Sequence, residues 1–215
     1  MKNLFFTISI LLLVLSCKAQ SPIVPLDTYI NEIADNSYVK DTDNELNKFV
    51  GTWTFNNGTT SFTITLQKQE QKFNDDYYED YLIGEYAYSN NGLNIIDTLS
   101  ELPDENSDDD SSENGLINNV IISQNTNYNI GGRYIVTGPD HSCPDCAENE
   151  RRIELYFIDP DRKYLSIDLF LRYIVGETNP EKITATIRAR SGVVIPVDGF
   201  ISPRVPYGTY LMEKQ

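Results

Sequence analysis

The sequence has few of the residues on which most enzymes and nucleic-acid-binding proteins depend. Its 215 residues include one histidine, His141, and contain no Gly-x-Ser-x-Gly, His-Glu-x-x-His or glycine-rich phosphate-binding motif. Lysine and arginine number 17 against 32 aspartates and glutamates, so the formal net charge is −15. Binding to a nucleic-acid backbone needs clustered basic residues. We therefore expect no enzyme, no cofactor and no nucleic-acid partner.

Long hydrophobic segments are also scarce. One apolar run, at residues 4–15, is too short for a membrane-spanning helix, which needs about 20 residues. Lys2 precedes this run and Ser16 follows it, as is typical of a secretory signal peptide. Val14-Leu15-Ser16-Cys17 resembles a bacterial lipobox, which implies a lipid on Cys17. We expect a signal peptide at residues 1–16 and a mature lipoprotein that acyl chains such as palmitate hold at the cell envelope, on the outer membrane.

Only three cysteines are present. If Cys17 carries a lipid, Cys143 and Cys146 remain to pair with each other, and a disulfide is the default in the oxidising compartment that the leader implies. A metal site is the weaker alternative, because His141, Cys143 and Cys146 supply three of the four ligands that zinc needs. A redox dithiol would require the first cysteine at the N-terminus of a helix, and none is predicted there.

From residue 49 onward, apolar and polar side chains alternate, which is typical of strands with one buried face. Asn56-Asn57-Gly58 has the chemistry of a tight hairpin turn. The alternation predicts strands at residues 49–55, 60–68, 79–88, 93–96, 116–123, 128–137, 152–159, 164–174, 182–190 and 209–214. Consecutive strands joined by short turns favour an all-β fold, an up-and-down antiparallel meander that forms a barrel or a strongly bent sheet. A sandwich of two sheets is the alternative.

The segment that precedes these strands has a different pattern. Residues 17–48 are expected to form a polar tether and a short helical segment. Leu26, Tyr29, Ile30 and Ile33 have the spacing of one face of a helix, and a second helical turn is expected just before residue 49.

Residues 97–114 carry eight acidic and no basic residues, and we expect them to form a mobile loop within a single β domain at residues 49–215. Asp104, Asn106 and Asp108 match the first three ligand positions of a calcium-binding EF-hand. The sixth position lacks the required glycine and the twelfth lacks the glutamate, so a solvated loop is favoured.

The start of the first strand resembles two known groups of proteins. Phe49-Val50-Gly51-Thr52-Trp53 is similar to the Gly-x-Trp strand of lipocalins and other calycin barrels, which implies that an arginine from a late strand packs across the tryptophan. The arginines available for this role are Arg172, Arg188 and Arg190. Residues 41–53, together with the leader at residues 16–20, resemble an uncharacterised family of small bacterial lipoproteins, which implies a lipid-anchored β domain of unknown function.

An eight-stranded barrel has room either for its own side chains or for one small ligand. The side chains expected to line a ligand cavity or the core are Phe49, Trp53, Phe62, Tyr86, Tyr134, Leu169 and Arg188. No set of inward polar groups indicates a ligand, so a filled or partly open interior is favoured.

We therefore expect a lipocalin-like binding or interaction module, with a small apolar ligand or an envelope protein as its partner. A structural or accessory protein without a ligand is the first alternative. An envelope hydrolase that uses Glu154 and Asp168 is the second, although an outward, solvated position near Arg172 explains Asp168 more simply.

Overall fold

The structure is a computed structural model that describes residues 21–103, 128–141, 143–190 and 199–215. The expected signal peptide, Cys17, the strand at residues 116–123 and the EF-hand-like positions lie outside the described residues.

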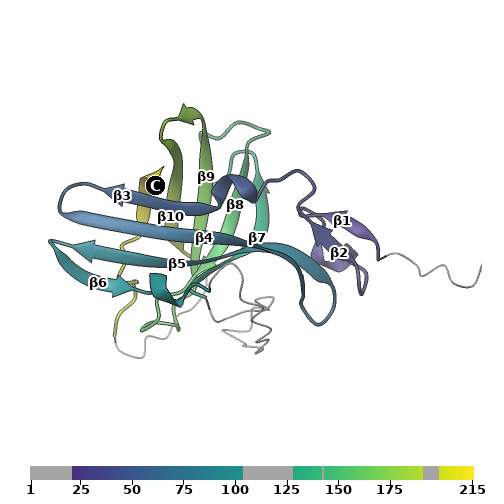
Figure 1. Cartoon of the computed structure of the whole chain (residues 1–215), viewed down its shortest axis with the longest axis horizontal. Helices are drawn as coiled ribbons and strands as arrows, with labels where there is room; N and C mark the ends of the chain where they lie inside the picture. The colour runs from purple at the N-terminus through teal and green to yellow at the C-terminus, as the bar shows by residue number, and fades with distance from the viewer. Residues whose placement is uncertain (1–20, 104–127, 142, 191–198) are drawn as a thin grey trace, which may run out of the picture.

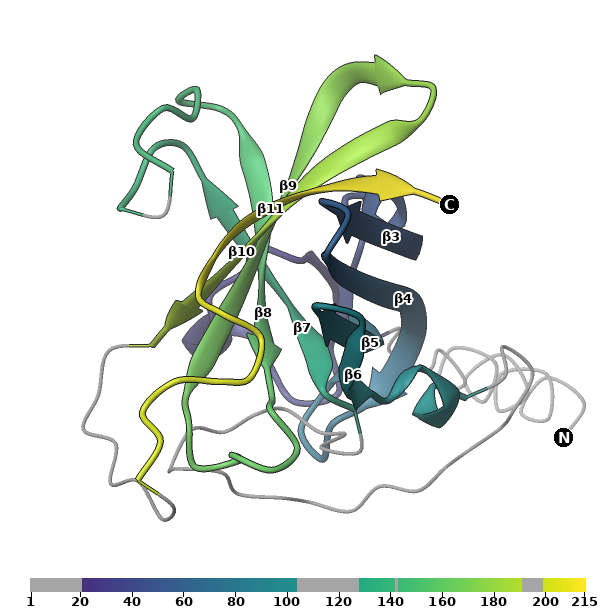
Figure 2. The same ribbon diagram turned by 90° about the vertical axis from the view of Figure 1, so that its left-hand side faces the viewer.

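Eight strands form a closed antiparallel barrel (Figures 1 and 2). They are β3 (Gly51–Asn56), β4 (Thr60–Phe73), β5 (Tyr78–Asn90), β7 (Ile130–Thr137), β8 (Arg151–Phe157), β9 (Ile167–Thr178), β10 (Glu181–Ala189) and β11 (Gly208–Lys214). Each strand pairs with the one that follows it around the barrel, and β11 returns to pair with β3. The prediction of an all-β, up-and-down antiparallel barrel is confirmed, and the two-sheet sandwich is wrong.

Three short strands lie outside the barrel (Figure 1). β1 (Ile23–Pro25) pairs in parallel with β2 (Tyr38–Lys40), β2 pairs in parallel with the start of β5, and β6 (Leu93–Asp97) pairs with the end of β5. The middle of the same β5 edge pairs with β7. A Cβ atom on Gly84 would lie 2.5 Å from Leu66 Cδ2 and 2.7 Å from the carbonyl oxygen of Thr65, so this position of β5 requires glycine.

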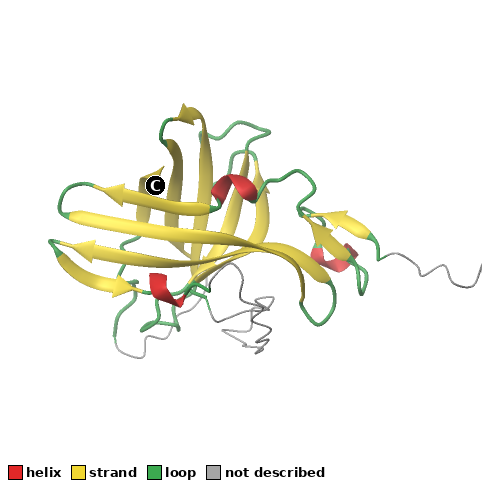
Figure 3. Cartoon of the chain, viewed as in Figure 1, coloured by secondary structure: helices red, strands yellow, loops and turns green. Residues whose placement is uncertain are grey.

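Helical structure in the described residues is limited to the 3-10 turns η1 (Ile30–Glu32), η2 (Asn47–Phe49) and η3 (Leu99–Glu101) (Figure 3). The amphipathic helix predicted from Leu26 to Ile33 is therefore wrong. Leu26 is buried, but Tyr29 is 68% exposed and Ile30 65% exposed, so half of the predicted apolar stripe covers no surface. A helix this short is not stable in water without burying such a stripe. None of the helical segments described is long and apolar enough to cross a bilayer.

Trp53, on β3, has no exposed surface. Its indole Nε1 donates a hydrogen bond to the carbonyl oxygen of Phe49 at 2.7 Å. The cation beside its ring is Lys214, whose Nζ lies 5.2 Å from the ring centroid. The lipocalin resemblance implied an arginine in this place, and that expectation is wrong because the last strand, β11, carries Lys214 directly opposite Trp53.

Aromatic rings fill the middle of the barrel. Phe62 lies edge-on to Tyr86 and Phe157, with centroid distances of 6.2 and 6.4 Å, and Tyr86 and Phe157 are 4.5 Å apart. The hydroxyl of Tyr86 donates to the carbonyl oxygen of Ile158 at 3.0 Å, so its polar atom is satisfied within the core.

Candidate functional site

The side chains expected to line a cavity separate into two groups. Five of them have no exposed surface and belong to the packed core: Phe49, Trp53, Phe62, Tyr86 and Leu169. The other two, Tyr134 and Arg188, lie on the outside of the barrel, so their assignment to the interior is wrong.

A break in the strand register explains the error at Tyr134. Ile130 points into the core, and uninterrupted alternation would place Tyr134 on the same face. The pairing of β7 with β8 shifts between Gly131 and Tyr134, so Ile135 packs against the core instead and Tyr134 is 61% exposed. Arg188 alternates with the buried Ile187 and therefore projects from the outer side of β10.

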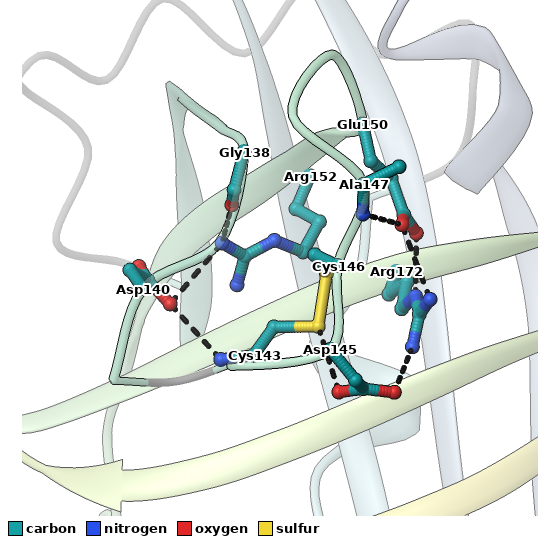
Figure 4. Close-up of polar contacts among 9 residues, drawn as sticks. All are labelled: Gly138, Asp140, Cys143, Asp145, Cys146, Ala147, Glu150, Arg152 and Arg172. Atoms are coloured by element: carbon teal, nitrogen blue, oxygen red, sulfur yellow. Dashed lines mark hydrogen bonds and ion pairs between the residues drawn. A yellow bond between two sulfur atoms is a disulfide. The ribbon is translucent and has the colours of Figure 1, made fainter.

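The outer face of β7–β10, called the outer face below, brings together the polar side chains that alternate with the core. One row of paired residues crosses it from Tyr134 to Glu154, Phe170 and Thr186. A neighbouring row joins Tyr156, Asp168 and Arg188. The β7–β8 loop at residues 138–150 lies at one end of this face (Figure 4).

A disulfide joins Cys143 and Cys146 in that loop (Figure 4). The main-chain N–H of Cys143 donates to Asp140 Oδ1 at 2.9 Å, which fixes the start of the bridge. A cysteine binds a metal ion as a thiolate, and the two sulfurs of a disulfide are not thiolates. The alternative metal site formed with His141 would therefore require this disulfide to be reduced. In the part of the chain that the structure describes, no group of three or more His, Cys, Asp or Glu side chains is placed to hold a metal ion.

Two arginines on the barrel hold this loop in place (Figure 4). Arg152, only 2% exposed, donates to the carbonyl oxygen of Gly138 at 2.8 Å and forms an ion pair with Asp140 at 3.2 Å. Arg172 binds both carboxylate oxygens of Glu150, at 2.5 and 3.1 Å. This hydrogen bonding from Arg172 lowers the pKa of Glu150 below its usual value, so the ion pair persists into mildly acidic solution.

A second charged cluster lies at the other end of the face. Arg190 donates to Asp168 Oδ1 at 2.6 Å and lies 3.5 Å from Glu154 Oε1, so one guanidinium contacts both carboxylates. The sequence correctly placed Asp168 on the outer side beside an arginine, but the predicted solvated position is wrong because Asp168 is only 8% exposed. The arginine is Arg190, since Arg172 pairs with Glu150. Burial, and then the charge of Asp168, raises the pKa of Glu154.

Arg188 completes this second cluster. It lies opposite Asp168 in the strand register, and its Nη1 is buried without a hydrogen-bond partner among the residues that the structure describes. A buried donor of this kind is uncommon in folded proteins, because an unmade hydrogen bond costs about 1–3 kcal/mol.

The outer face therefore combines a loop fixed by a disulfide and two arginines, an exposed tyrosine and a paired cluster of carboxylates and arginines. The sequence analysis missed Arg152 and Glu150 as parts of it. The alternation of Arg152 and Glu154 with Ile153 and Leu155 was a usable signal for the outward position of Arg152. The place of Glu150 had no such signal, because it depends on the fold of the loop.

Comparison with known proteins gives one match. The model of a family described as a family of unknown function (DUF6705) matches residues 1–215. Neither the curated proteins nor the solved structures include a match to the chain.

Proposed function

The chain belongs to the DUF6705 family, whose function is unknown, and we propose that it is a lipid-anchored interaction protein of the bacterial cell envelope. Its outer face binds a protein partner, and its barrel interior is a structural core. The leader at residues 1–16 and the lipobox-like residues before Cys17 support the anchor.

This proposal rests on the burial of the side chains that were predicted to line a ligand cavity, five of which are packed in the core. A lipocalin-like barrel holds its ligand inside. Here Trp53, Phe62 and Tyr86 have no exposed surface, and all three belong to one hydrophobic core cluster. A small apolar ligand would have to displace these rings, whereas a partner on the outer face would not.

The composition of the outer face suits a protein partner. Tyrosine and arginine are the residue types enriched at the energetic centres of protein interfaces. Tyr134 is 61% exposed, and Arg172 and Arg190 are held by ion pairs in fixed orientations. Side chains that are already ordered lose less conformational entropy on binding.

The proposed anchor limits where the partner can be. Five residues lie between Cys17 and Ile23, the first residue of β1, and an extended chain across these six residue steps spans at most about 20 Å. The barrel would then stay close to the membrane surface, so the partner is another protein of the envelope.

Photocrosslinking in cells tests the proposal. A benzophenone amino acid replaces Tyr134, and in a control protein it replaces Leu93, which is 67% exposed on β6 outside the proposed interface. We expect an adduct with one envelope protein from position 134 and not from position 93. With the purified partner, Tyr134→Ala is expected to weaken binding about tenfold, equivalent to about 1.4 kcal/mol. Equal labelling from both positions, or no loss of affinity, would argue against this interface.

Native mass spectrometry of the full-length protein in detergent tests the interior separately. We expect the mass of the lipidated chain without a bound small molecule. A co-purified lipid that survives in the Tyr134→Ala variant would show that the interior, and not the outer face, is the binding site.

A hydrolase is the second candidate, because Glu154 and Asp168 lie in one cluster and the pKa of Glu154 is raised. A carboxyl group with a raised pKa can act as a general acid beside a second carboxyl group. We favour the interaction protein because Arg190 binds both carboxylates. Hydrolysis of nitrophenyl glycosides or esters by the purified protein, abolished by Glu154→Gln, would favour the hydrolase instead.

A further inference from the structure

β4 continues beyond the end of its partner β3 (Figure 1). The pairing of the two strands ends at Gly51 and Leu66, whereas β4 runs on to Phe73 with β5 along its other edge. Beyond Leu66, the edge of β4 that pairs with β3 faces η2 and Val50 instead. Between this edge and η2 lies a groove of about 550 Å³, a volume within the range of ligand sites. Its lining residues are Asn47, Val50, Gln67, Lys68, Gln69 and Glu70.

The direction of the main-chain groups along this part of β4 follows from hydrogen bonds elsewhere on the strand. The carbonyl oxygen of Thr60 accepts from Asn57 N–H, so Thr60 faces β3, and every second residue does the same as far as Lys68, because β4 keeps its register with β5 up to Gln69. In agreement, the carbonyl oxygen of Thr59 accepts from the N–H of Asn91, just after β5, so the odd-numbered residues of this strand face the other edge. Lys68 therefore directs its N–H and C=O groups into the groove, past the last residue of β4 that β3 pairs with.

The walls of the groove are polar and held in place. Lys68 Nζ lies 3.2 Å from Asp41 Oδ2 and 3.1 Å from Glu70 Oε1. Asp41 also accepts hydrogen bonds from the main-chain N–H groups of Glu45 and Leu46, which fixes the residues just before η2. The groove thus has its shape before any ligand binds, and this reduces the cost of binding.

The side chains of the groove match the chemistry of a peptide. Asn47, Gln67 and Gln69 carry carboxamides, which offer the same donor and acceptor groups as a peptide bond. The amide nitrogens of Asn47 and Gln67 donate within the protein, to Asn44 Oδ1 and to the carbonyl oxygen of Pro103, which holds both side chains in place. The single positive charge of Lys68 lies between the two negative charges of Asp41 and Glu70, and the Glu70 side chain is 68% exposed. The site is therefore net negative.

We propose that this groove binds an extended, basic peptide segment of another protein, which adds to the free edge of β4 as a short strand. Strand addition uses main-chain hydrogen bonds for affinity and side-chain pockets for specificity. The formal net charge of −15 favours a basic segment and disfavours a second copy of this chain. This site is separate from the outer face and goes beyond the function proposed for it.

Binding of a defined probe tests the proposal. The probe is fluorescein-labelled Lys-Thr-Val-Thr-Lys-Val-amide, and its binding to the full-length protein in detergent is measured by fluorescence anisotropy. We expect a Kd below about 1 mM, and a Kd at least tenfold higher when glutamates replace the two lysines of the probe. Methylating the peptide nitrogens of one alternate set is expected to abolish binding, whereas methylating the other set leaves it nearly unchanged. No binding at about 1 mM, or equal effects of the two methylated sets, would overturn strand addition.

Two protein variants locate the site. Asn47→Trp places a large ring at the groove and is expected to weaken binding at least tenfold. Thr42→Trp is the matched control, because Thr42 is also exposed before η2 but does not line the groove. Hydrogen exchange of the Lys68 amide is expected to slow when the probe binds. Equal binding by both variants, or unchanged exchange, would place the peptide elsewhere. Tyr134→Ala is expected to leave probe binding unchanged, so failure of this site and of the outer face are distinguishable.

Discussion

Removal of the ring at the centre of the barrel tests whether the interior is packed. Phe62 has no exposed surface, and its ring lies 5.1 Å from that of Tyr210 in addition to its contacts with Tyr86 and Phe157. Burial of such a side chain contributes about 1.5–3 kcal/mol. Phe62→Ala also leaves a cavity of about 100 Å³, which adds about 2 kcal/mol at about 24 cal/mol per Å³. We expect the free energy of unfolding to fall by about 4 kcal/mol.

Urea denaturation measures this loss, with the fluorescence of Trp53 as the probe of unfolding, because it is the single tryptophan and is fully buried. Thr63→Ala is the matched control on the outer side of the same strand. It removes only the hydrogen bond between the Thr63 and Thr54 hydroxyls, at 3.1 Å, and is expected to cost about 1 kcal/mol or less. A loss of less than about 1.5 kcal/mol for Phe62→Ala, with an unchanged denaturant slope, would mean that the ring borders an open space. An interior ligand site would then be favoured over the outer face.

Three further predictions concern buried charge and the anchor. Arg204→Met is expected to lower the free energy of unfolding by about 3 kcal/mol, because it leaves the buried carboxylate of Asp159 without the guanidinium that contacts it at 2.6 Å. Addition of Asp159→Asn should recover part of this loss in urea denaturation, and no recovery would refute the pairing. Burial raises the pKa of Glu85 above its usual value, so the folded protein binds this proton up to a higher pH than the unfolded chain does. The stability that protonated Glu85 contributes is therefore lost as the pH rises from the usual pKa of a glutamate through the raised one. Glu85→Gln should flatten the dependence of the free energy of unfolding on pH in this range, and an unchanged dependence would exclude Glu85 as its cause. Cys17→Ala is expected to move the protein from the membrane fraction to the soluble envelope fraction, and retention in the membrane would contradict the anchor.

Much of the fold was predictable because strand structure is encoded between neighbours in the chain. The period-two pattern around Trp53 and Phe62 placed both in the core, and Asn56-Asn57-Gly58 correctly indicated the turn between β3 and β4. Consecutive hairpins favoured an up-and-down meander, since each strand can pair with the next without a long connection. These inferences need only residues that are close in sequence.

The errors arose where distant parts of the chain decide the outcome. Tyr134 fits the inward pattern of Ile130, but a register shift between β7 and β8 turns it outward. Tyr29 and Ile30 have helical spacing but no surface to cover, so no α-helix forms there.

The sequence by itself determined the segments that form the eight barrel strands and most of the side chains in the core, because alternation and turn chemistry act over a few residues; it did not indicate the short strands β1 and β2. Only the tertiary structure decided that Lys214 packs against Trp53, that Arg190 bridges Glu154 and Asp168, and that β4 extends past β3 with an edge that no other described strand pairs with. Each of these contacts depends on the register between strands far apart in the chain. That register is set by closure of the whole barrel and not by any local pattern.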